Sequence, residues 1–303
     1  MMKILITGGG GFIGSHLVEH YQNRAEIIVL DNLRTGHRRN LDGLQCRFVE
    51  GSILDQKLLG QLLEGVDYVF HLAALVSVPE SMERLNETIE INVRGFLNVL
   101  EAARKAKVKK LVFASSAAVY GEDPAPFKLE SQTPDPQSPY AITKLDGEYY
   151  CKLFTRENGL STASLRFFNV FGSRQDPNGA YAAAVPIFLK QAREGKPIAI
   201  YGDGKQTRDF IYVKDIVGAL AFAAERIGVE GVFNAGYGTS LSILELAEMI
   251  KRATNSSSGV EFLAERPGDL RHSTAGVTRL LDAGWKPIYS VEQGLQCLSS
   301  DIC

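Results

Sequence analysis

Residues 3–15 read KILITGGGGFIGS, a short apolar run followed by a turn dense in glycine. The apolar run predicts a buried β-strand, and the apolar spacing after the turn predicts a helix. Gly8, Gly11 and Gly14 let the backbone turn sharply, approach a phosphate group closely and pack a helix against a strand. Because the first N–H groups of a helix attract anions, this stretch predicts the phosphate-binding turn of a dinucleotide-binding domain.

An acidic residue ends the second apolar run of the chain. Residues 27–30 read IIVL, and Asp31 follows them. A carboxylate at about this distance from the glycine turn can accept hydrogen bonds from the adenosine ribose of NAD, whereas the structural alternative is a cap at the end of a strand. With the glycine turn upstream, Asp31 favours NAD as the cofactor.

Strand patterns alternate with helical patterns through the first half of the chain. This rhythm predicts an α/β fold with a Rossmann-type doubly wound parallel sheet, whose ligands bind at the carboxyl ends of its strands. We therefore expect an NAD-binding Rossmann domain over residues 1–168, to which some later segments return, and a smaller interleaved C-terminal lobe for the substrate over residues 169–303. The predicted strands of the first half are residues 3–7, 27–31, 47–50, 68–71 and 110–115.

The composition argues against several kinds of partner. The 303 residues carry a net charge of -2, which offers no bulk attraction to nucleic acid or to an anionic membrane. No apolar run approaches the roughly 18 residues of a membrane span, and no signal peptide is visible. The 4 cysteines show neither a Cys-x-x-Cys pair nor zinc-ligand spacing, so we expect free thiols, no metal site and a cytoplasmic protein.

A serine, a tyrosine and a lysine form a candidate catalytic group. Tyr140 and Lys144 share one face of a predicted helix that begins at Ser138-Pro139, because they are one helical turn apart. Positive charge from the lysine and from an oxidised nicotinamide favours the phenolate, which can take a proton from a sugar or alcohol hydroxyl. The tyrosine–lysine spacing alone is common on surface helices. Ser116, at the end of a predicted strand, can bond the same substrate oxygen, and its presence favours the catalytic interpretation.

These motifs resemble those of the extended short-chain dehydrogenase/reductase family and, within it, of the UDP-hexose 4-epimerases, closest to the UDP-N-acetylglucosamine 4-epimerase type. The resemblance covers nearly the whole chain. One departure is Ser52, because the family usually has at this position an aspartate that meets the adenine. The segments that carry the resemblance are residues 7–15, 31–32, 71–74, 92–95, 115–121, 138–144, 165–172, 201–210 and 266–269.

The resemblance implies an epimerisation without net redox change. Tyr140 would take the proton of the sugar C4 hydroxyl while hydride passes from C4 to NAD, and Ser116 would steady the oxygen. Lys144 would lower the pKa of the tyrosine and hold the nicotinamide ribose. The 4-keto sugar would then turn about its diphosphate and receive the hydride on its other face.

The resemblance also assigns binding residues. Arg208 and Arg266 would anchor the diphosphate, because guanidinium groups match its oxygens, although arginines are more often paired on the surface. Asp269 would accept hydrogen bonds from the uridine ribose. The residues expected to bind NAD are Gly8, Gly11, Phe12, Ile13, Gly14, Asp31, Asn32, Ser52, Ile53, Leu72, Ala73, Ala74, Asn92, Ser115, Tyr140, Lys144 and Phe168. Those expected to bind the UDP-hexose are Ser116, Tyr140, Asn169, Ala183, Arg208, Arg266, Asp269 and Ser273.

A small residue favours an N-acetylated sugar. Residues 175–183 and 271–273 resemble the corresponding segments of epimerases that prefer UDP-N-acetylhexosamines. Ser273 occupies the position that, in the family, gates the pocket near the C2 substituent: a tyrosine there excludes an acetamido group, and a serine leaves room. We expect UDP-GlcNAc and UDP-GalNAc as substrates, with UDP-glucose and UDP-galactose as a second pair. The alternative for Ser273 is a solvent-facing loop serine.

Other functions stay open at this stage. Sugar-nucleotide 4,6-dehydratases and decarboxylases carry carboxylates shortly after the serine or threonine that corresponds to Ser116. This chain has Ala117-Ala118 there. A non-catalytic NAD-binding protein would typically lack the tyrosine or the lysine, and both are present. These features favour an epimerase.

The resemblance finally implies a homodimer. In the family, the helices matching residues 83–105 and 140–157 pair across the dimer interface. The apolar residues that could line such an interface, or could instead face the sheet, are Leu97, Leu100, Tyr149 and Leu153.

Overall fold

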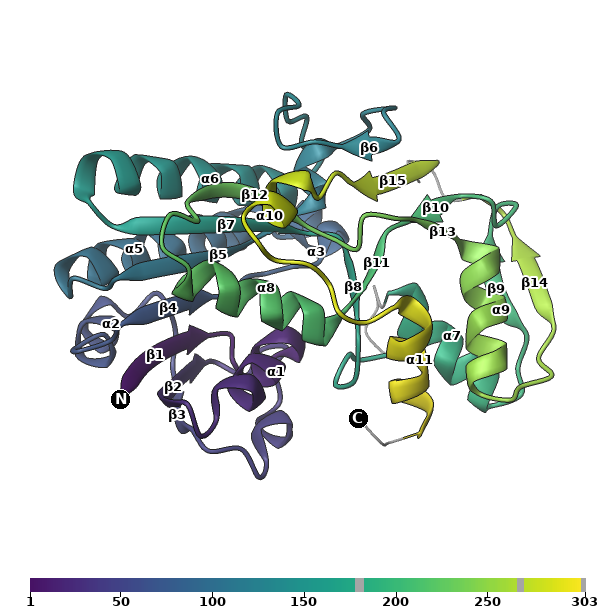
Figure 1. Cartoon of the computed structure of the whole chain (residues 1–303), viewed down its shortest axis with the longest axis horizontal. Coiled ribbons are helices and arrows are strands. Elements are labelled where there is room, and N and C mark those ends of the chain that lie inside the picture. The colour runs from purple at the N-terminus through teal and green to yellow at the C-terminus, as the bar shows by residue number, and fades with distance from the viewer. Residues whose placement is uncertain (178–182, 266–269, 301–303) are drawn as a thin grey trace. The chain divides into compact units, whose positions relative to one another are not determined.

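The computed structural model describes residues 1–177, 183–265 and 270–300 (Figure 1). The chain divides by its contacts into two compact units. Unit 1 comprises Met1–Gly121, Thr133–Phe167 and Val217–Phe233, and unit 2 comprises Glu122–Gln132, Phe168–Ile216 and Asn234–Cys303. The chain therefore passes more than once between the two units.

One sheet has seven strands, which lie between residues 2 and 235. Its strand order is β12-β7-β5-β4-β1-β2-β3, and the ladders from β7 to β3 are parallel. From β1, the strands β2 and β3 follow on one side, and β4, β5 and β7 follow on the other. This order confirms the predicted Rossmann-type doubly wound sheet. The strands are β1 (Met2–Thr7), β2 (Ala25–Asp31), β3 (Arg47–Glu50), β4 (Tyr68–His71), β5 (Lys110–Ser116), β7 (Ser161–Phe167) and β12 (Gly231–Ala235).

Helices cover both faces of this sheet. Buried side chains of α2 (Gln56–Leu62), α5 (Phe96–Lys105) and α6 (Pro139–Asn158) form one hydrophobic cluster with Val69 of β4. On the other face, Tyr21 of α1 (Phe12–Tyr21) packs against Phe70 of β4 and donates a 2.7 Å hydrogen bond to Glu225 of α8 (Val213–Glu225). Successive side chains of a strand point to opposite faces of the sheet, and helices cover both faces. Both faces are therefore buried, which explains the continuous apolar runs.

Unit 2 contains small sheets and short helices. One sheet has the order β13-β10-β15-β6, and two strand pairs, β11-β8 and β14-β9, are parallel. The strands are β6 (Phe127–Lys128), β8 (Asn169–Phe171), β9 (Ile198–Tyr201), β10 (Thr207–Arg208), β11 (Phe210–Tyr212), β13 (Leu241–Ser242), β14 (Val260–Leu263) and β15 (His272–Ala275). The helices are α7 (Ala184–Arg193), α9 (Ile243–Ala253), α10 (Thr278–Asp282) and α11 (Val291–Ser300).

The helix predicted over residues 83–105 is interrupted. The structure has α3 (Val78–Glu83), α4 (Leu85–Ile89), a π-helical turn η2 (Glu90–Gly95) and then α5. At Gly95, an added Cβ would lie 2.6 Å from the Ile53 side chain, so the π-helical turn packs closely against the loop after β3. Two short 3₁₀ turns, η1 (Arg38–Leu41) and η3 (Ala117–Tyr120), complete the described elements of the chain's first half.

The cysteine prediction is partly wrong. Cys46 and Cys151 are free thiols, as expected, but Cys297 in α11 is disulfide-bonded. A disulfide depends on how close two cysteines lie in space and not on their spacing in the sequence. The absence of Cys-x-x-Cys and zinc-ligand spacings therefore could not exclude a disulfide at Cys297.

Candidate active site

The glycine turn joins β1 to α1 through close backbone contacts. Gly8 has a positive φ of 74°, and an added Cβ would lie 2.7 Å from the backbone nitrogen of Ala73. An added Cβ at Gly14 would lie 2.3 Å from the carbonyl oxygen of Gly8. Among the described residues, none caps the first turn of α1 with its side chain. This turn therefore fits the pyrophosphate of a dinucleotide, with Phe12 and Ile13 opening the helix.

Asp31 at the end of β2 is tied to the glycine turn. Its carboxylate accepts hydrogen bonds from the backbone N–H of Gly10 at 2.9 Å and of Leu33 at 2.8 Å. The residue thus caps its strand, and each oxygen retains a further lone pair for a ribose hydroxyl. The neighbouring Asn32 is exposed and accepts from the backbone N–H of Arg34.

The loop after β3 holds two of the residues expected to bind NAD, Ser52 and Ile53. The Ser52 hydroxyl accepts a hydrogen bond from the backbone N–H of Leu54 at 3.1 Å, which makes it a turn residue. Ile53 is buried. Asn98 of α5 donates to the carbonyl oxygens of Ile53 and Leu54, so α5 holds this loop in place.

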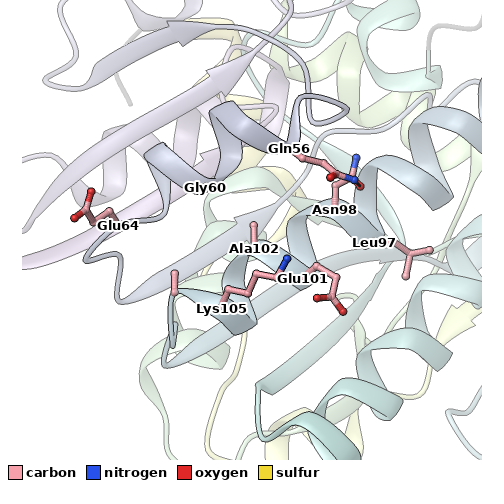
Figure 2. Close-up of a pocket in the computed structure, with 9 residues that line it drawn as sticks. Gln56, Gly60, Glu64, Leu97, Asn98, Glu101, Ala102 and Lys105 are labelled. Atoms are coloured by element: carbon pink, nitrogen blue, oxygen red, sulfur yellow. Dashed lines mark hydrogen bonds between the residues drawn. The ribbon is translucent and has the colours of Figure 1, made fainter.

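A pocket of about 420 Å³ lies between α2 and α5 (Figure 2). Gln56 and Asn98 lie at one end of it, joined by a 2.8 Å hydrogen bond from Gln56 Nε2 to Asn98 Oδ1. Glu101 and Lys105 line it further along α5. None of the predicted cofactor or substrate residues lines this pocket.

The loop after β4 is held by Thr7 and Asn92. The Thr7 hydroxyl lies 3.4 Å from the backbone nitrogen of Ala73, in the run Leu72-Ala73-Ala74 expected to contact NAD. Asn92, in the π-helical turn, bonds both the N–H and the carbonyl of Leu75 at 2.7 and 2.9 Å, and donates to the Thr143 hydroxyl at 3.1 Å. We expect Asn92 to act on the cofactor through this loop.

Ser116, Tyr140 and Lys144 come together in unit 1. Ser116 ends β5, accepts from the backbone N–H of Ala118 at 3.1 Å, and hydrogen-bonds the Tyr140 hydroxyl. Lys144 is buried, donates to the carbonyl of Ala114 at 2.7 Å, and lies 5.7 Å from the ring centroid of Tyr140. Helix α6 begins at Pro139 after a Ser138 cap, as the sequence predicts. The sheet and one helix therefore position all three candidate catalytic groups.

Burial is the main cause of the pKa shifts of Tyr140 and Lys144. Burial raises the pKa of Tyr140, and the hydrogen bond from Ser116 only partly opposes it. Burial lowers the pKa of Lys144 to about 7. The expected lowering of the tyrosine pKa by Lys144 stays a prediction, because it also depends on a bound nicotinamide. A phenolate would need further positive charge, as an oxidised nicotinamide carries.

Unit 2 brings three expected substrate residues around Asp209. The Asn169 side chain donates to the Asp209 carbonyl at 2.9 Å, and the Asp209 N–H donates to the Ser273 carbonyl at 3.0 Å. Arg208 precedes Asp209 and is the register partner of Ser273 across β10 and β15. Ser273 is 7% exposed and lies within a strand, so the solvent-facing loop alternative is wrong.

Asp209 itself was missed by the sequence analysis. Its buried carboxylate accepts from the backbone N–H groups of Tyr237, Gly238 and Ala275 at 2.7, 2.9 and 3.0 Å. Burial raises its pKa to about 6. A lone acid between strand-forming residues, as in Arg208-Asp209-Phe210, is the signal that could have found it.

The other expected binding residues are less informative. Ala183 is exposed at the start of α7, and the Phe168 ring is buried in unit 2. Arg266 and Asp269 lie outside the described residues. Across the described ranges, no group of three or more histidine, cysteine, aspartate or glutamate residues could hold a metal ion. The same ranges contain no helix with the length and apolar character to cross a bilayer.

A dinucleotide-binding α/β fold with a serine–tyrosine–lysine group defines the class of protein. The family model described as "NAD dependent epimerase/dehydratase family" matches residues 4–236. The chain belongs to this family.

Relatives of known name carry several activities. The chain is 40% identical to the UDP-N-acetylglucosamine 4-epimerase from Methanobrevibacter ruminantium M1, solved in complex with UDP-N-acetylmuramic acid, with a TM-score of 0.94 and coverage of 97% of this chain and 96% of that one. It is 37% identical to a putative UDP-glucose 4-epimerase of Methanocaldococcus jannaschii, over 97% of this chain and 96% of the relative. It is 39% identical to a UDP-N-acetyl-alpha-D-glucosaminuronate decarboxylase of Bacillus cytotoxicus, over 97% and 95%.

Proposed function

We propose that this protein catalyses the NAD-dependent 4-epimerisation of UDP-hexoses. The observation that carries the proposal is the meeting of the Ser116 and Tyr140 hydroxyls beside the Lys144 ammonium. The glycine turn and Asp31 lie in the same unit and suit NAD. Relatives that bear epimerase names match the chain over nearly its whole length.

The residues of the chain have separate roles in the proposed reaction. NAD, when bound, accepts the hydride from the sugar C4 and later returns it. Tyr140 takes the proton of the C4 hydroxyl, and Ser116, which already accepts from Ala118, donates a hydrogen bond to the developing ketone oxygen and keeps its own proton. Lys144, anchored on the Ala114 carbonyl, holds the nicotinamide ribose. Tyr140 returns the proton after the 4-keto sugar has turned.

The residues after Ser116 support epimerisation over related chemistries. Ala117 and Ala118 form the start of the 3₁₀ turn η3, where a dehydratase or a decarboxylase would need carboxylates. Neither side chain can exchange a proton. The chain is similar to a relative named as a decarboxylase. However, it lacks the acid–base groups that a decarboxylase is expected to have beside Ser116.

The direct test is an assay of the purified protein with UDP-GlcNAc, UDP-glucose, UDP-xylose and UDP-glucuronic acid without added cofactor. We expect interconversion of at least one 4-epimer pair, with NAD released when the protein is denatured. Elimination to a 4-keto-6-deoxy product, or release of CO₂ from a UDP-uronic acid, would replace the epimerase proposal. No conversion of any UDP-sugar, even with NAD added, would refute it.

The size of residue 273 is proposed to set the substrate. Ser273→Tyr is expected to lower kcat/KM for UDP-GlcNAc at least about 10-fold more than for UDP-glucose, because a ring would fill the space for the acetamido group. Ser273→Ala is the control, since it removes the hydroxyl without adding volume and should keep the preference. Kinetics with both substrates decide, and an equal loss on both would remove the gating idea.

A homodimer is proposed from apolar side chains on two adjoining helices. The sequence analysis placed Leu100 among the interface candidates, but it is fully buried in the core of unit 1, and Leu97 packs against that core. The other two candidates, Tyr149 and Leu153, are exposed and belong to an apolar surface on α4 and α6, which are in contact. Its members, each 41–59% exposed, are Leu85, Ile89, Ile142, Tyr149 and Leu153. Apolar surface of this kind typically marks an interface.

Charge placed on this surface should dissociate the dimer. Leu153→Arg is expected to weaken dimerisation about 10-fold or more, because the arginine would be desolvated in both copies. Ile227→Arg, at an apolar residue that is 96% exposed elsewhere in unit 1, is the matched control. Analytical ultracentrifugation measures both. A monomeric native protein, or a dimer indifferent to Leu153→Arg, would contradict the proposal.

We also propose a cytoplasmic location. The free thiols of Cys46 and Cys151 support it, and the disulfide at Cys297 opposes it. Cell fractionation would decide between them.

A further inference from the structure

A buried ion pair lies beside the candidate catalytic group and has no part in the chemistry described above. Glu148 of α6 and Arg166 of β7 are 4% and 3% exposed. Arg166 Nε and Nη2 donate to the two carboxylate oxygens of Glu148 at 2.8 and 2.7 Å. The Ser115 hydroxyl donates to the same carboxylate at 2.5 Å. Removing two charges from water is costly, so a pair at this position calls for an explanation.

The first link runs along α6. Tyr140, Lys144 and Glu148 are spaced by one turn each, so they share one face of the helix. Each bonds a different residue at the end of β5: Tyr140 bonds Ser116, Lys144 bonds the Ala114 carbonyl, and Glu148 bonds Ser115. The Glu148 contact is therefore the third attachment of the catalytic helix to the catalytic strand.

The second link runs through Arg166. Arg166 is the register partner of Ser115 across β5 and β7, so the two side chains reach Glu148 from adjacent strands. The guanidinium carbon also lies 4.7 Å from the ring centroid of Tyr120. Tyr120 ends η3, the turn whose first residue follows Ser116. The ion pair thus contacts the helix, the strand and the turn that together position the three catalytic groups.

The charges around this pair are balanced. The other titratable groups that face it or the nearby lysine are the Cys151 thiol, whose pKa burial raises to about 12, the Tyr120 phenol, and His71. Burial and the charge of Lys144 lower the pKa of His71 to about 3, so it is neutral at pH 7. Loss of Glu148 alone would leave the buried charge of Arg166 unopposed, one helical turn along α6 from Lys144 and two turns from Tyr140.

We propose that Ser115, Glu148 and Arg166 are positioning residues, which fix α6 on the end of β5 so that Tyr140 and Lys144 meet Ser116 in register. The proposal rests on the proposed function for its rate predictions. Its geometric claim concerns the titration of Tyr140 and can be tested without any UDP-sugar.

The test combines kinetics with the titration of Tyr140 in the NAD-loaded protein, read by ultraviolet difference absorbance against Tyr140→Phe. Glu148→Gln is expected to lower kcat about 10-fold with little change in KM, and to move the titration to lower pH by about 1 unit, because Arg166 is left unbalanced. Ser115→Ala, the mildest change, should lower kcat about 3-fold. In Glu148→Met/Arg166→Met both charges are gone, so the titration should return towards its native position while kcat stays low.

Lys110→Met is the matched control. Lys110 is a buried cation at the opposite end of β5, where it donates to the carbonyls of Ala223, Arg226 and Val229. We expect this variant to lose stability but to keep the native kcat and titration. A native kcat and titration in Ser115→Ala and Glu148→Gln, or a double variant with native kcat, would overturn the proposal. If the native protein converts no UDP-sugar, the titration of Tyr140 in Glu148→Gln still tests whether the ion pair acts on the catalytic group, and only the function fails.

Discussion

Replacement of Tyr140 by phenylalanine is expected to lower kcat for UDP-sugar epimerisation about 10³-fold. The substitution removes the proposed proton acceptor together with its hydrogen bond to Ser116, and the ring stays beside Lys144. Ser116 keeps its hydrogen bond from Ala118, so the end of β5 should not move. We therefore expect native stability and native NAD content. The measurement is a single-turnover and steady-state assay of the variant together with its bound cofactor.

The control for this variant lies on the same helix. Tyr149 of α6 is 59% exposed, and Tyr149→Phe removes a phenolic hydroxyl outside the catalytic group. It should retain native kcat. Undiminished epimerisation by Tyr140→Phe would show that another group takes the proton, and the proposed mechanism would then be wrong.

Gly8→Ala is expected to abolish NAD binding and to lower the free energy of unfolding by about 2–5 kcal/mol. Two penalties combine at this position. The backbone has a positive φ of 74°, which disfavours any residue with a Cβ, and the new methyl group would lie 2.7 Å from the backbone of Ala73. Since Ala73 belongs to the loop expected to contact NAD, relief of the clash would displace the cofactor site.

Gly65→Ala separates the two penalties. Gly65 has a similar φ of 71°, and an added Cβ there meets nothing within 4 Å. It should cost about 1–2 kcal/mol from the backbone alone and leave NAD binding unchanged. Denaturant unfolding and cofactor titration measure both variants. Equal behaviour of the two, or native NAD affinity in Gly8→Ala, would contradict the assignment of this turn.

The proposed base depends on its cofactor for charge. Burial shifts the pKa values of Tyr140 upward and of Lys144 downward, which are both unfavourable directions for a phenolate beside an ammonium. We infer that Tyr140 becomes an effective base when oxidised NAD is bound, since the positive ring adds the charge that the protein lacks. This dependence would suit an enzyme that must not release its cofactor between the two half-reactions.

Some features could be predicted from short stretches of sequence. The strand, glycine turn and helix of residues 3–15 predicted the dinucleotide-binding fold, and the structure and the family match confirm that class. The start of α6 at Ser138-Pro139 was also predicted, because a cap residue and a proline specify a helix start locally. The π-helical turn at Glu90–Gly95 was not, because no local sequence signal distinguishes it from an α-helix.

By itself, the sequence determined the class of fold, the family and the identity of the groups available for chemistry. These depend on residue types and spacings within single elements, which local conformational preferences decide. Only the tertiary structure decided that Leu100 is core, that Ser273 is enclosed in a strand, and that Glu148 pairs with Arg166. It also decided the directions of the pKa shifts. Burial and pairing are set by what distant parts of the chain bring to a residue, and that information is absent from any one stretch of sequence.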